Sequence, residues 1–144
     1  MSAPYSAIVM DHFLAPRNAR RMEAPDRVGA AGTPASGPFL VLYLRLEGER
    51  IAEASFQTYG CAPAIAAGSL LAERLPGTTL AAARAWTAPA IEAALGGLPR
   101  HKRACAELAA QALELALVPP PGGESVLPSA RSEDVLPTPP GATP

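Results

Sequence analysis

The stretch QTYGCAPAIAAGSLLAERL, from Gln57 to Leu75, decides the fold because it changes from a strand-like to a helix-like pattern at a cysteine. Pro63 suits the first turn of a helix, since the missing N–H of proline costs nothing there. This helix is predicted to end at Pro76-Gly77. Cys61, at the junction, is either a small buried hydrophobe or a thiolate placed at a helix start for chemistry.

Upstream of this stretch the sequence predicts a β-hairpin. Two β-rich runs, Phe39–Leu46 and Ile51–Tyr59, flank a turn that contains glycine. The second run alternates apolar and polar residues, so one face of the sheet is expected to face water. Residues 23–38 are rich in Gly, Pro and Ala and are interpreted as a loop. Before them, Ser6–Leu14 is predicted to form a short helix.

Downstream, the pattern predicts three further helices. The first is capped by Thr78 or Thr79, the second begins at Thr87, and the last runs to about Leu117. The core face of the last helix is expected to consist of Cys105, Leu108, Ala109, Ala112, Leu115 and Ala116. Strands followed by helices predict an α+β fold, with helices packed on one face of a small sheet.

Length and composition limit the class of protein. A chain of 144 residues, 49% hydrophobic, is predicted to form one domain over residues 1–118. Residues 119–144 contain eight prolines and no apolar period, so they are expected to form a disordered Pro-rich tail. The net charge of −1 indicates no preference for nucleic acid or an anionic membrane, and no apolar run is long enough for a membrane span. The expected location is the cytoplasm, because no secretion signal is recognised.

The two cysteines are the strongest candidates for chemistry. Cys61 lies at a predicted helix start, and Cys105 lies in the first turn of the last helix, behind Lys102 and Arg103. Helix N-termini and nearby cations stabilise a thiolate, so both thiols are expected to be more acidic than an ordinary cysteine, whose pKa is about 8.5. His101 is four residues before Cys105, a spacing that places two side chains on one helix face.

Three segments give the chain a resemblance to a known family: YSAIVMDHFLAPRNAR (residues 5–20), FQTYGCAPAIAAGSLLAERLPGTTL (56–80) and LPRHKRACAELAAQAL (98–113). They resemble the U-type iron–sulfur cluster assembly scaffolds, IscU and the N-terminal domain of NifU. The resemblance implies an α+β fold with a small three-stranded antiparallel sheet and helices packed on one face. It places the third strand, which the residue pattern does not reveal, near Gln57.

The resemblance also implies a site, position by position. Two ligand cysteines of the family are retained as Cys61 and Cys105, and the family's counterpart of Cys105 accepts persulfide sulfur from a cysteine desulfurase. Ser36, Pro38 and Ala104 stand where the family has a cysteine, an aspartate and a histidine. Serine is a poor ligand for soft metals, so Ser36 is not expected to bind one.

The implied partners are a cysteine desulfurase and apoprotein clients. An Hsp70-type chaperone is a weaker expectation, because its recognition segment is altered and only Leu98, Pro99 and Lys102 are kept. Neither nucleic acid nor a membrane is expected as a partner.

The resulting prediction is a divergent scaffold or carrier, not an enzyme, that binds iron and sulfide through Cys61 and Cys105. An iron–sulfur cluster, expected here to be of the 2Fe–2S type, usually requires four thiolates, and a homodimer would supply them. Alternatively, His101 could replace the missing histidine ligand from a position three residues earlier. Two alternatives remain open. One is a degenerate scaffold that binds partners without a cluster, and the other is a zinc protein that uses Cys61, Cys105, His101 and water.

Overall fold

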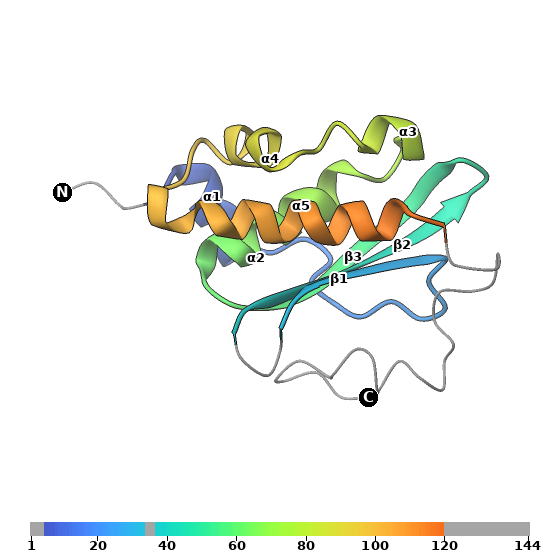
Figure 1. Ribbon diagram of the computed structural model, residues 1–144, viewed down its shortest axis with the longest axis horizontal. Helices are drawn as coiled ribbons and strands as arrows, with labels where there is room; N and C mark the ends of the chain where they lie inside the picture. The colour runs from blue at the N-terminus through green and yellow to red at the C-terminus, as the bar shows by residue number, and fades with distance from the viewer. Residues whose placement is uncertain (1–4, 34–36, 120–144) are drawn as a thin grey trace.

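The computed structural model describes residues 5–33 and 37–119 and shows a layer of helices on one face of a three-stranded sheet (Figure 1). The elements are α1 (Ala7–Leu14), β1 (Arg27–Gly32), β2 (Phe39–Glu47), β3 (Arg50–Tyr59), α2 (Ala62–Arg74), α3 (Leu80–Ala83), α4 (Ala88–Ala94), the 3-10 turn η1 (Arg100–Lys102) and α5 (Arg103–Leu117). The predicted α+β class is confirmed. The predicted tail lies, after Pro119, outside the described residues.

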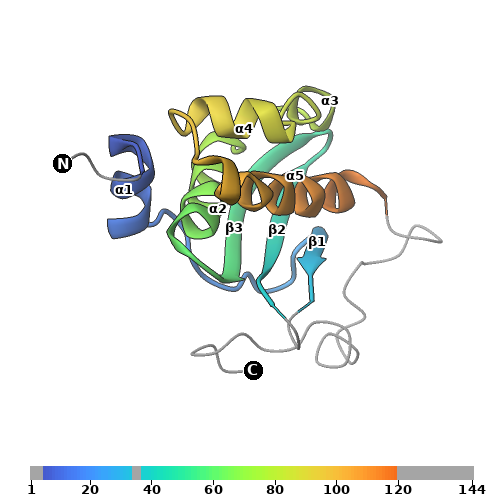
Figure 2. The ribbon, with the colours of Figure 1, turned by 60° about the vertical axis from the view of Figure 1, so that its left-hand side comes forward.

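The helices form the second layer in a definite order. α2 packs against β3, and α5 packs against β1 and β2. Figure 2 shows α5 lying across the sheet, with α4 beside α5 and α1 on the outer side of α2. The long helices α2 and α5 therefore cover the sheet together.

The hairpin of β2 and β3 is confirmed, but the third strand is not where it was expected. The strands pair antiparallel in the order β1-β2-β3, and β1 covers Arg27–Gly32, inside the segment interpreted as a loop. Gln57 begins no strand, because it lies within β3 opposite Val41. The sequence RVGAAG contains few of the β-branched and aromatic residues that favour strands. Pairing with β2 and packing against α5 determine its conformation.

The two faces of the sheet are both covered in part. Leu40, Leu42 and Phe56 are fully buried beneath the helices. On the opposite face, Phe39, Val41 and Tyr43 form a second cluster with Met22. The expectation that one face meets water is therefore wrong for this part of the sheet, because the segment after α1 returns across it.

The cap residues confirm most of the predicted helix ends. Ser6, Thr79 and Thr87 each accept a hydrogen bond from a backbone N–H in the first turn of the following helix. Gly96 and Gly97 have φ of +83° and +95°, a region that only glycine enters at no cost, so α4 ends before them.

α5 lies unusually close to β1 because both contribute small residues. A Cβ atom added to Gly29 would lie 1.9 Å from the carbonyl oxygen of Ala112 and 2.5 Å from the backbone nitrogen of Ala116. The buried face of α5 also differs from the predicted one, because Leu113 is buried whereas Leu115 is 45% exposed. The buried face of α5 consists of Ala106, Ala109, Ala112, Leu113, Ala116 and Leu117.

Gly29→Ala should destabilise the fold, because the new methyl group meets backbone atoms that cannot move aside without lifting α5. The free energy of unfolding, measured by urea denaturation, should fall by about 1–3 kcal/mol or more. Gly37→Ala is the matched control, because a Cβ atom there meets nothing within 4 Å. Equal stability of the two variants would contradict the close contact between α5 and β1.

Candidate functional site

The first site residue, Cys61, lies at the N-terminus of α2. It is the N-cap residue, with extended backbone angles φ −88° and ψ 178°, and Pro63 occupies the first turn as predicted. β3 ends at Tyr59, so only Gly60 separates the strand from Cys61. A thiol in this position is close to the free N–H groups of the first turn, which favour an anion.

The second site residue, Cys105, lies in the first turn of α5 and meets Cys61. The two Sγ atoms are 3.3 Å apart, although 44 residues separate them in the sequence. Both thiols are free and partly buried. The first turns of α2 and α5 therefore bring the chain's two cysteines into contact.

The two thiols differ in acidity. Burial alone would raise the pKa of Cys61, but the hydrogen bond with Cys105, the backbone N–H of Ala64 and the charge of Lys102 together lower it. Burial, followed by the hydrogen bond and the negative charge of Cys61, raises the pKa of Cys105 to about 12. The expectation that both thiols are acidic is therefore wrong for Cys105. When the pair loses one proton, the negative charge therefore lies on Cys61, which accepts a hydrogen bond from the Cys105 S–H group.

The remaining positions implied by the resemblance contribute less to the candidate site. His101 is exposed in η1, and Ala104 is exposed at the start of α5. Pro38 is exposed and lies beside Gly60, since a Cβ atom on Gly60 would lie 3.4 Å from that of Pro38. Ser36 lies outside the described residues. Within residues 5–33 and 37–119, no three His, Cys, Asp or Glu side chains form a group that could hold a metal ion.

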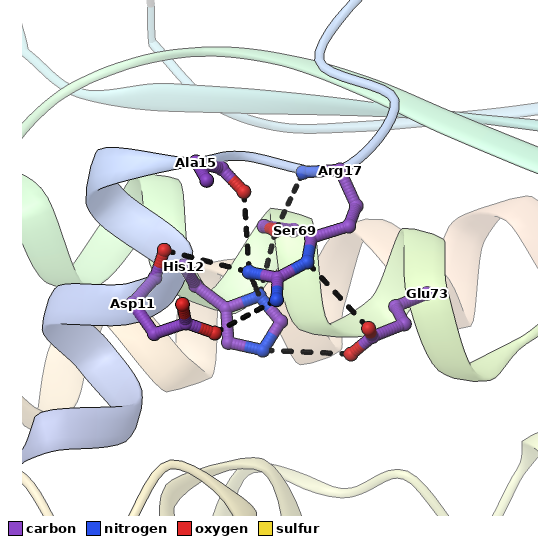
Figure 3. A network of polar contacts seen from close by, with 6 residues as sticks. All are labelled: Asp11, His12, Ala15, Arg17, Ser69 and Glu73. Atoms are coloured by element: carbon purple, nitrogen blue, oxygen red, sulfur yellow. Dashed lines mark hydrogen bonds and ion pairs between the residues drawn. The ribbon is translucent and has the colours of Figure 1, made fainter.

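A second polar cluster joins α1 to α2, and the sequence analysis assigned it no role (Figure 3). The side chain of Arg17 lies 2.7 Å from Asp11 and 3.5 Å from Glu73. His12, only 4% exposed, has Nδ1 at 2.7 Å from the Ser69 hydroxyl and Nε2 at 3.6 Å from Glu73. Ser69 and Glu73 are four residues apart, the spacing that places two side chains on one helix face. That spacing was the signal available in the sequence.

The hydrogen bonds of this cluster assign a neutral His12. Nη1 of Arg17, which can only donate, lies 3.3 Å from Nδ1 of His12, so Nδ1 is an acceptor. The Ser69 hydroxyl therefore donates to Nδ1, and its oxygen accepts the backbone N–H of Arg17 at 2.9 Å. Nε2 then carries the proton and faces the Glu73 carboxylate. Burial, followed by the charge of Arg17, lowers the pKa of His12 below its ordinary value.

Solved structures share this fold. A Fervidobacterium islandicum protein, described as an iron–sulfur cluster assembly scaffold for the SUF system, superposes with a TM-score of 0.62 at 22% identity, over 79% of this chain and 96% of that one. The N-terminal part of a NifU-like protein from Brucella abortus superposes with a TM-score of 0.51 at 18% identity, over 79% and 81% of the two chains. The domain therefore shares its α+β fold with these two proteins.

Sequence comparisons give the family. The family of NifU-like N-terminal domains matches residues 4–120. The iron–sulfur cluster assembly scaffold protein IscU 1 of Archaeoglobus fulgidus is 44% identical over 79% of this chain and 74% of its own length. The nitrogen fixation protein NifU of Cereibacter sphaeroides is 48% identical over 83% of this chain and 48% of its own length. The chain belongs to the family of NifU-like N-terminal domains, which confirms the resemblance to the U-type scaffolds.

Across residues 5–33 and 37–119, every helix is too short or too polar to pass through a bilayer.

Alkylation of the thiols by iodoacetamide should follow two separate titrations. Cys61 should react with a lower midpoint than an ordinary cysteine, whereas Cys105 should react only at strongly alkaline pH. In the Cys61→Ser variant the neighbouring thiolate is absent, so the pKa of Cys105 should fall. Peptide mapping by mass spectrometry after alkylation at each pH distinguishes the two residues. Identical profiles for both cysteines in the wild-type protein would contradict the unequal pair.

Acid should destabilise the protein through His12. Its pKa is lower in the folded than in the unfolded state, so the unfolded state binds the proton first. The free energy of unfolding should therefore decrease as the pH falls below about 6.5, by up to about 1.4 kcal/mol per pH unit. Urea denaturation between pH 8 and pH 5 measures this slope.

The His12→Asn variant should lose that part of the slope, because an amide does not titrate. His101→Asn removes the chain's other, exposed histidine and should retain the wild-type slope. A slope unchanged in His12→Asn would exclude His12 as its origin.

Proposed function

We propose that this chain is an iron–sulfur cluster scaffold or carrier that binds iron and sulfide through Cys61 and Cys105. The observation that carries the proposal is the contact between the two thiols, 3.3 Å apart at the first turns of α2 and α5. Burial opposes ionisation of Cys61, but its contacts with Cys105, Ala64 and Lys102 lower its pKa, so a thiolate ligand forms there more readily than at Cys105. Thiolates are the ligands that iron–sulfur clusters require. Several relatives of the chain are named iron–sulfur cluster assembly scaffold proteins.

The number of ligands favours a dimeric site. One protomer offers two thiolates, whereas a 2Fe–2S cluster takes four ligands, so two protomers related by a two-fold axis would complete the set. Tyr59, which is 52% exposed and lies two residues before Cys61, stacks on Phe39 and offers apolar surface for such a contact. In this arrangement the cluster is cargo, bound at the surface where two copies meet.

The partners and the location follow from the same proposal. A cysteine desulfurase would donate sulfur, with Cys105 as the persulfide acceptor implied by the family, and apoproteins would receive the cluster. The two free thiols suit a reducing compartment, and we assign the protein to the cytoplasm. A chaperone of the Hsp70 type gains no support, because Leu98 is only 8% exposed and Pro99 precedes the turn η1.

A degenerate scaffold that binds partners is the second candidate. It is favoured by the absence of a group of three metal-binding side chains among the described residues. The outer face of α1 would supply a docking surface, because Ile8, Phe13 and Leu14 are 43%, 37% and 74% exposed. The zinc alternative has no comparable support, because the exposed His101 forms no such group with Cys61 and Cys105.

Anaerobic reconstitution with ferrous iron and sulfide separates these functions. The wild-type protein should become coloured and elute from a sizing column as a dimer with about one cluster per two chains. Cys61→Ala and Cys105→Ala should each remove both the colour and the dimer. His101→Ala is the matched control and should behave as the wild type, whereas a zinc protein would lose metal in this variant.

The positions that depart from the family provide the opposite test. Ser36→Cys adds a third thiolate and should favour a cluster within one protomer, and Pro38→Asp adds an oxygen ligand. A wild-type protein that stays colourless and monomeric, while the double variant takes up iron, would reject the scaffold function in favour of the partner-binding module.

A further inference from the structure

A hollow of about 300 Å³ lies between α5 and the segment that joins α3 to α4. Arg84 and Trp86 line it from the joining segment, which Figure 1 shows above the C-terminal half of α5. One stripe of α5 lines the other side: Ala110, Leu113, Glu114 and Leu117. These positions are three, four and seven residues apart, so their side chains share one face of the helix. The described residues that line the hollow include neither thiol.

The walls of the hollow suit a proline-containing peptide. Trp86 is partly buried, and the guanidinium carbon of Arg74 lies 5.9 Å from the centroid of its ring. Leu113 and Leu117 supply aliphatic surface opposite the joining segment. Grooves lined by aromatic side chains bind proline-rich segments, because the extended conformation of such segments costs little entropy to fix.

The rim of the hollow carries more positive than negative charge. Arg84 lines it, and Arg74 lies over the ring of Trp86. Glu114 is the one acidic residue among the described residues of the lining. Within residues 5–33 and 37–119, neither arginine forms an ion pair with a carboxylate. An occupant that carries acidic residues next to its apolar ones would therefore complement the rim.

One segment of the C-terminal tail has this chemistry. Glu133–Pro140 reads EDVLPTPP, in which two carboxylates precede a valine, a leucine and three prolines. Val126–Pro128 repeats the VLP triplet, but Glu124 and Ser125 before it carry one charge between them, and no further proline follows directly. A tail too poor in apolar residues to form a core of its own can still supply a short docking motif.

The length of the tail lets this segment reach the hollow of its own chain. Leu117 both lines the hollow and ends α5, and fifteen residues, 118–132, connect it with Glu133. A flexible chain of that length has a root-mean-square end-to-end distance of about 20 Å. The stripe from Ala110 to Leu117 is about 10 Å long. A tether of this kind gives an effective concentration on the order of millimolar, so a motif of modest affinity stays bound.

We infer that residues 133–140 dock in the hollow of the same chain, with their valine, leucine and prolines against Trp86 and their two carboxylates beside Arg84. The inference goes beyond the proposed function, since it involves neither the thiols nor iron. It makes the hollow a recognition site for acidic, proline-containing peptide segments, and the occupant is the protein's own tail.

The test uses the full-length protein and its own fluorescence. Trp86 is the single tryptophan of the chain, so its emission reports on the hollow alone. Leu136→Asp should shift the emission to longer wavelength and increase the acrylamide quenching constant severalfold, because the indole loses its apolar cover. Leu127→Asp makes the same change in the other VLP triplet and should match the wild type. Neither substitution alters a residue of the described domain.

A charge exchange tests the contact at the rim. Arg84→Glu should increase the quenching constant as Leu136→Asp does, because the new carboxylate repels the acidic pair. Adding Glu133→Lys and Asp134→Lys to this variant should restore the protection of Trp86. A synthetic SEDVLPTPP peptide should also restore it in the Leu136→Asp variant, whereas a peptide of the same composition in scrambled order should not.

The opposite results would overturn the inference. Equal quenching of the wild type and Leu136→Asp would show that the tail does not cover Trp86. An equal effect of Leu127→Asp would reject the assignment to residues 133–140. Quenching of the wild type that changes with protein concentration would place a second copy, and not the chain's own tail, in the hollow.

Discussion

The close contact between α5 and β1 is the constraint on which the rest of the structure depends. At Gly29 the strand presents no side chain, and the alanines of α5 lie directly against its backbone. α2 approaches β3 in the same manner, since a Cβ atom on Gly68 would lie 2.4 Å from the ring of Phe56. Both helices are therefore held at short distances from one sheet. Their first turns meet at one end of it, where Cys61 and Cys105 come into contact.

A second kind of interaction secures α1. Its attachment to α2 combines the burial of Val9 with a polar cluster in which the Ser69 hydroxyl both accepts and donates a hydrogen bond. An unpaired buried group would cost free energy, so each partner in the cluster is needed by the others. Apolar packing thus positions the thiol-bearing helices, and hydrogen bonding positions the helix beside them.

Local patterns were sufficient to predict most of the elements. The hairpin and the helices capped by Ser6, Thr79 and Thr87 follow from residues close together in the sequence. β1 could not be predicted in this way, because RVGAAG is a strand only through its partners β2 and α5. The buried face of α5 was also predicted incorrectly, since the pattern placed Leu115 in the core instead of Leu113.

The two residues of the site could be predicted from the sequence, but the distance between them could not. The resemblance identified Cys61 and Cys105, which are 44 residues apart, yet their separation of 3.3 Å is a result of tertiary packing. Burial raises the pKa of both thiols, and the contact between them then lowers that of Cys61 and raises that of Cys105 further. Reasoning from helix starts treated the two independently and therefore assigned them the same acidity.

The unequal acidity of Cys61 and Cys105 affects how any cation binds to them. Because burial and the contact with Cys61 raise the pKa of Cys105 to about 12, the pair still holds the Cys105 proton at neutral pH. A cation that takes both as thiolates must displace the remaining proton, so uptake is coupled to proton release. By mass action, the apparent affinity of one pair should increase about tenfold for each unit of rising pH. The proton held between the two sulfurs thus competes with the metal, and a higher pH favours metal binding.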